Sequence, residues 1–238
     1  MSTTSTNRRA SQRPGYFFQL PWPPTRNRCL LLFVGGQFVS LTGTYMQAVA
    51  LGWMVYRLTG SALSLGLLGF CTQLPVLLLA PVAGIEADRR SRQRILLATQ
   101  STGMIVSFAI AAITLAGLVE AWHIWALALL LGCGNAFDFP ARQAFIAEIA
   151  GKAELSIAIP LNSFVTNAAR AIGPAIAGLV IARAGEGWCL LVNAASYSFI
   201  IVALLLIKTG HRAPETRSTS VLDGLTDGFY FARRMLSV

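Results

Sequence analysis

The residue with the clearest chemical potential is Arg170, which lies near the middle of an apolar stretch over residues 156–182. A guanidinium is permanently charged and carries five hydrogen-bond donors, so it suits an anion. No Asp or Glu lies at comparable depth in the apolar stretches. We expect Arg170 to act in substrate binding or ion coupling, with recognition of negative charge as the sharper hypothesis. A packing arginine bonded to backbone carbonyls is the alternative.

A second polar group lies in the first apolar stretch of the chain. Gln37, Ser40, Thr44 and Gln47 are separated by three, four and three residues, so they share one face of a helix. This stripe is a candidate lining of a substrate cavity. It is equally typical of side chains that hydrogen-bond neighbouring helices.

The composition places these polar groups in a membrane protein. Hydrophobic residues make up 55% of the 238-residue chain, charged residues 12%, and the mean hydropathy is +0.60, whereas soluble domains are about 25% charged. Strand-length alternation is absent, so helices must span the bilayer. The expected fold is an all-α bundle of six transmembrane helices over residues 29–207. The expected spans are 29–56, 61–85, 95–119, 121–139, 156–182 and 187–207.

The distribution of basic residues predicts the orientation of these spans. Sixteen of the 19 Lys and Arg residues lie in segments that share one side, against Arg57 and Arg183 on the other. Because Lys and Arg accumulate on the cytoplasmic side, both termini are expected to be cytoplasmic. The charge is spread over loops, which argues against nucleic-acid binding. Residues 1–28 are expected to form a disordered arm, and residues 208–238 a linker with a short amphipathic helix.

Catalysis and metal binding find little support. The chain has two histidines, His123 and His211, and four singly placed cysteines, so it lacks metal-site spacing, a phosphate loop and a hydrolase motif. We expect no cofactor and no enzymatic activity. A membrane enzyme and a non-transporting scaffold remain the alternatives to a transporter.

Three motifs point to a known family. The turn between the second and third spans contains Gly84, Asp88, Arg89 and Arg92, with Ser91 and Gln93 where a glycine and a cation are usual. It resembles the signature loop of the major facilitator superfamily. Gly173-Pro174 followed by Gly178 resembles the fifth-span motif of drug-proton antiporters, and should kink the helix and allow close packing at Gly178. The segment from Asp138 to Arg142 resembles the corresponding segment of the exporter branch that includes the enterobactin exporter and macrolide efflux proteins.

The resemblance implies a secondary active exporter of small molecules. Members have twelve spans in two halves that rock around a central site, so this chain is expected to be the N-terminal half. Its partners would be the bilayer, a small-molecule substrate, and a C-terminal six-span half or a second copy. The resemblance also implies proton-coupled efflux of drugs or siderophore-like anions across the cytoplasmic membrane, with Gln37, Thr44 and Gln47 lining the cavity.

The remaining charged residues are candidates for gating. In the family, the residue matching Asp88 caps a helix of the other half; a solvated acid that pairs with Arg92 is the alternative. Asp138 should lie at the cytoplasmic boundary, about 26 Å from the outer end of its span. There it would join Arg142 and the signature loop in a charge network, unless it pairs only with Arg142.

Overall fold

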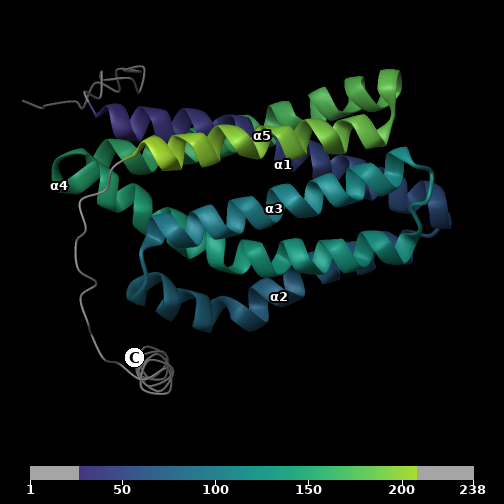
Figure 1. The fold of residues 1–238 in the computed structure, drawn as a ribbon, viewed down its shortest axis with the longest axis horizontal. Helices are drawn as coiled ribbons and strands as arrows, with labels where there is room; N and C mark the ends of the chain where they lie inside the picture. The colour runs from purple at the N-terminus through teal and green to yellow at the C-terminus, as the bar shows by residue number, and fades with distance from the viewer. Residues whose placement is uncertain (1–26, 208–238) are drawn as a thin grey trace, which may run out of the picture.

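A computed structural model describes residues 27–207, except for the side chain of Asp88. Within this range α-helix is the only regular secondary structure, as predicted (Figure 1). The expected N-terminal arm, except its last two residues, and the expected C-terminal linker lie outside the described residues. The helices are α1 (Arg28–Thr59), α2 (Ala62–Arg89), α3 (Arg92–Leu115), α4 (Ala121–Ala184) and α5 (Glu186–Leu206).

All five helices are long and apolar enough to cross a membrane. The count differs from the six separate spans expected, because the fourth and fifth both lie within the 64-residue α4. Helical geometry is broken inside α4 at Gly151, whose φ is +63° and ψ is +177°. This left-handed φ favours glycine because a Cβ would be strained there. We call residues 121–150 the first arm of α4 and residues 152–184 the second arm.

The two arms run in opposite directions along the bundle. One core contains Leu30 and Leu204, and the first arm contributes Phe145 to it while the second arm contributes Leu161. The other core, which contains Met54 and Leu190, takes Ile124 from the first arm and Ala177 from the second. Both arms therefore reach both cores, and Figure 1 shows α4 doubling back at the end that carries its label.

Polar side chains bond the backbone at the start of α1 and at the end of α5. Asn27 caps α1 by accepting a hydrogen bond from the backbone of Leu30, and its amide donates to the carbonyl of Ile149. Gln93 donates to the carbonyls of Leu204 and Ile207 at the end of α5. These carbonyls have no partner within their own helix. Gln93, which departs from the family motif, thereby ties α3 to α5.

Candidate gating and substrate sites

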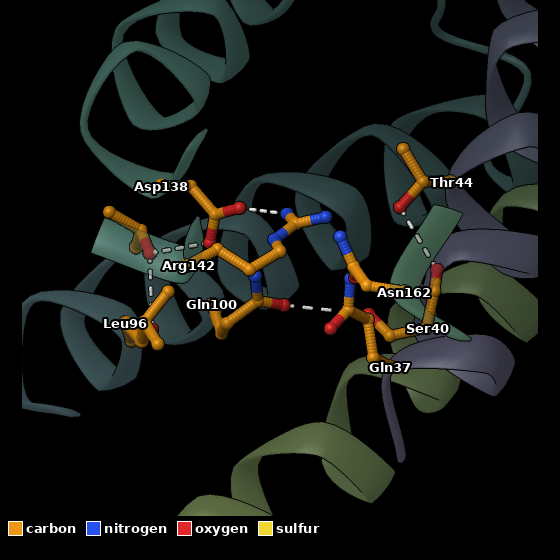
Figure 2. A network of polar contacts seen from close by, with 9 residues as sticks. Gln37, Ser40, Thr44, Leu96, Gln100, Asp138, Arg142 and Asn162 are labelled. Carbon is orange, nitrogen blue, oxygen red and sulfur yellow. Dashed lines mark hydrogen bonds and ion pairs between the residues drawn. The ribbon is translucent and has the colours of Figure 1, made fainter. Parts of the chain in front are cut away.

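Asp138 lies inside the helix bundle, with 3% of its surface exposed. Its carboxylate accepts hydrogen bonds from Gln100 Nε2 at 2.6 Å and Thr99 Oγ1 at 3.1 Å, and it forms an ion pair with Arg142 one turn further on. Figure 2 shows this group between α3 and α4. A buried charge needs such partners to offset its lost hydration. The hydrogen bonds from Thr99 and Gln100 to Asp138 therefore link α3 to the first arm of α4.

The helix that contains Asp138 does not end at residue 139, where the predicted span ends, and the placement of Asp138 at the cytoplasmic boundary stays a prediction. The helix continues through Pro140 to the break at Gly151, so about 18 Å of the first arm follows Asp138. A proline alone does not end a helix when packing holds the flanking turns.

Among the described side chains, neither Arg89 nor Arg92 of the signature loop forms an ion pair with Asp138. Arg92 instead pairs with Glu148 of the first arm, with an N–O distance of 3.1 Å. Arg89 is exposed at the end of α2, and Gly84 has open space around it. The side chain of Asp88 lies outside the described residues. Sequence reasoning missed Glu148, which lies 56 residues from Arg92 along the chain.

The polar stripe of α1 is largely engaged in contacts between helices. Gln47 is 3% exposed, and its Oε1 accepts from Asn193 Nδ2 at 2.6 Å and Ser107 Oγ at 2.7 Å. Thr44 donates to the carbonyl of Ser40 within α1. The prediction that Gln47 lines the substrate cavity is therefore wrong, because its side chain is buried and bonded to α3 and α5. The alternative, hydrogen bonding within the bundle, is what the structure shows.

Gln37 belongs to the same buried region as Asp138. Its Nε2 donates to Asn162 Oδ1 at 3.0 Å, linking α1 to the second arm of α4 (Figure 2). Its Oε1 is buried with no hydrogen-bond partner among the described residues. A cavity of about 10 Å³ lies beside it, lined in part by Gln100 and Arg142. This volume suits about one water molecule, so Gln37 contacts an internal space too small for a drug-sized substrate.

Arg170 lies on an exposed face of the second arm. Its Nε donates to Tyr45 Oη at 3.3 Å, and its guanidinium carbon is 5.6 Å from the centre of the Tyr45 ring, a cation–π distance. None of the acidic side chains that the structure describes pairs with it. Sequence reasoning missed Tyr45, which immediately follows Thr44 of the polar stripe and was not assigned a role.

The close approach between α1 and the second arm occurs at Gly173. A Cβ added there would lie 2.7 Å from Tyr45 Cβ and 2.9 Å from the carbonyl oxygen of Thr42. Gly178 was expected to be the close contact, yet nothing lies within 4 Å of its added Cβ. The helix continues through Pro174, and helical dihedral angles are lost at Gly151, outside the predicted fifth span, so a kink at Pro174 stays a prediction.

Together, the long apolar helices and the charged and amide side chains buried between them define a multi-pass membrane protein. The sequence profile of the transmembrane secretion effectors, a family of the major facilitator superfamily, matches residues 19–238. The chain therefore belongs to this family. The resemblance drawn from the signature loop is confirmed.

Three curated relatives show the breadth of the family. The staphyloferrin A transporter of Staphylococcus aureus is 32% identical over 73% of this chain and 44% of its own length. The multidrug efflux pump Tap of Mycolicibacterium fortuitum is 29% identical over 87% of this chain and 53% of its length. Macrolide efflux protein A of Streptococcus pyogenes is 24% identical over 61% and 36%. The chain spans about half the length of the first two of these relatives.

Proposed function

We propose that this chain forms the N-terminal half of a secondary active exporter that moves small molecules out across the cytoplasmic membrane. The observation that carries the proposal is the family match over residues 19–238, together with relatives named as transporters or efflux pumps and about twice as long. The second half would be another six-span unit. By analogy with those relatives, the substrates are drugs or siderophore-like anions.

Six membrane crossings follow if each arm of α4 crosses once. This is supported by the contacts of both arms with both cores, since a single 64-residue helix would be about 96 Å long and the hydrocarbon layer is about 30 Å thick. Gly151 would then lie on the cytoplasmic side with the signature loop. The surplus of Lys and Arg on that side supports cytoplasmic termini.

Polar contacts between helices favour movement of this half as one rigid body. Asp138 with Gln100, Arg92 with Glu148, and Gln47 with Asn193 each join different helices of the same unit. In alternating access, two such units rock around a site between them. Contacts inside one unit persist through that movement, so the ion pair of Asp138 and Arg142 has a structural role within this half. Gates must form with the other half, for which the exposed Arg89 and the uncrowded Gly84 are candidates, with the neighbouring Asp88.

Export is coupled to protons in this proposal, and a flux assay tests it. The complete transporter is reconstituted into vesicles, and ethidium movement is recorded with and without an imposed proton gradient. Gradient-dependent flux that collapses with a protonophore supports the exporter. A tightly folded protein that moves neither ethidium nor any of a panel of macrolides and anionic chelators would favour the scaffold alternative.

A further inference from the structure

Arg170 has one engaged edge and one free edge. Its Nε donates to Tyr45 Oη, and the aromatic ring lies beside the guanidinium. The two terminal nitrogens, Nη1 and Nη2, have no hydrogen-bond or ion-pair partner among the groups that the structure describes. Two parallel N–H groups on a planar fork match the two oxygens of a carboxylate. The free edge is therefore shaped for such a group.

Tyr45 is held in place by packing of the helix backbones. Gly173 brings the second arm so close to α1 that an added Cβ would collide with Tyr45 Cβ. The Tyr45 side chain starts from this contact and is only partly buried. Its hydroxyl oxygen accepts the hydrogen bond from Arg170, which leaves the hydroxyl proton free to donate to a ligand. Arg170 is thus oriented by a fixed partner on another helix.

Polar side chains precede Arg170 on its face of the second arm, although this arm is a membrane-length helix. Ser163, Asn167 and Arg170 follow one another by four and three residues, and all three are exposed on one face of the second arm. Large apolar side chains, including Ile172 and Leu179, are exposed on another face. A lipid-facing arginine is costly, and charged residues at this depth usually border a partner or a water-filled cavity. The polar face therefore borders a polar space.

We propose that Arg170 and Tyr45 form the binding site for a carboxylate group of the transported molecule, an inference that rests on the proposed export function. The two Nη groups donate to the carboxylate oxygens, and the Tyr45 ring contacts the apolar or aromatic part next to that group. Arg170 is the recognition residue, and Tyr45 positions it. The ligand class is an amphipathic carboxylic acid.

Binding of a matched pair of probes tests the site. Benzoate and the neutral benzamide have nearly the same shape, and their binding to the complete transporter in lipid nanodiscs is followed by ligand-observed NMR. We expect wild type to prefer benzoate. Arg170→Gln should weaken benzoate binding by about tenfold or more, as expected for loss of a charge-assisted pair, and leave benzamide unchanged. Arg170→Lys and Tyr45→Phe should give smaller losses.

Arg183→Gln is the control, because it removes the same charge from an exposed position at the end of the same arm. It should leave the preference for benzoate intact. Equal effects of Arg170→Gln and Arg183→Gln, or equal binding of benzoate and benzamide to wild type, would overturn the site.

Vesicle flux separates this inference from the exporter proposal. If flux of neutral and anionic probes is robust and Arg170→Gln leaves their ratio unchanged while removing pH dependence, the carboxylate site is refuted and export stands. If wild type shows charge-selective binding dependent on Arg170 but no flux of any probe, the site stands and the exporter proposal fails.

Discussion

Asp138 on the first arm of α4 accepts a hydrogen bond from Gln100 on α3 at 2.6 Å, while the same carboxylate pairs with Arg142. A negative charge is thus held between two helices in a region with little water. The side chain of Arg142 is 19% exposed and that of Asp138 4%. The arrangement stabilises this unit of the protein only while both charges are present.

The first prediction concerns the energy of this pair. Asp138→Asn should destabilise the folded protein by about 3–5 kcal/mol, because it leaves the Arg142 charge buried without its partner. Adding Arg142→Met should recover much of that loss, since the unpaired charge is then gone. Both variants and the single Arg142→Met are measured by reversible unfolding in mixed micelles.

The matched control is the exposed pair of Glu86 and Arg90, which has the same i,i+4 spacing and a 73% exposed arginine side chain. Glu86→Gln should change stability by less than about 1 kcal/mol. If the effects of Asp138→Asn and Arg142→Met on the free energy of unfolding simply add, the two residues are not coupled, and a stabilising ion pair is contradicted.

The second prediction compares two glycines of the second arm. Gly173→Ala should destabilise the fold by about 1–3 kcal/mol, because the new methyl group meets backbone and Cβ atoms of α1. Gly178→Ala has open space and should be neutral or stabilising, because alanine is the better helix former. Thermal aggregation of the detergent-solubilised variants ranks them. A reversed order would contradict the close packing at Gly173.

The third prediction concerns the path of α4 through the membrane. Topology reporters fused after residues 120 and 185 should report the outer side, and a reporter after residue 152 the cytoplasmic side. The reason is that both arms contact both cores, so Gly151 lies at the end opposite Glu120 and Gly185. Signals from one side at all three positions would exclude two crossings by α4.

Much of this architecture could be predicted from the sequence. Apolar runs separated by the basic turn around Arg92 indicate membrane helices, and the motifs that begin at Gly84 and Gly173 indicate the family. These features depend on local composition and spacing. The start of α4 at Ala121 was predicted at the same residue.

The position of polar partners could not be read in the same way. The distance of Asp138 from the start of its span predicted a position at the cytoplasmic boundary, but it could not show that the helix continues beyond residue 139 or that Gln100 of another helix donates to the carboxylate. Gln47 looked like a cavity residue because spacing shows which face it occupies and not what covers that face. Asn193 covers it. Whether a polar side chain is covered by another helix depends on tertiary contacts, which residue spacing does not show.

Drug accumulation in cells tests the central claim most directly. Cells without their own exporters receive this chain alone, or the chain continued into a second six-span half, with equal membrane levels confirmed. Ethidium and erythromycin accumulation is measured before and after dissipation of the proton gradient. The account predicts reduced, gradient-dependent accumulation with the two-half protein and empty-vector levels with this chain alone. Efflux by the chain alone, or accumulation of both probes at empty-vector levels with the two-half protein, would contradict it.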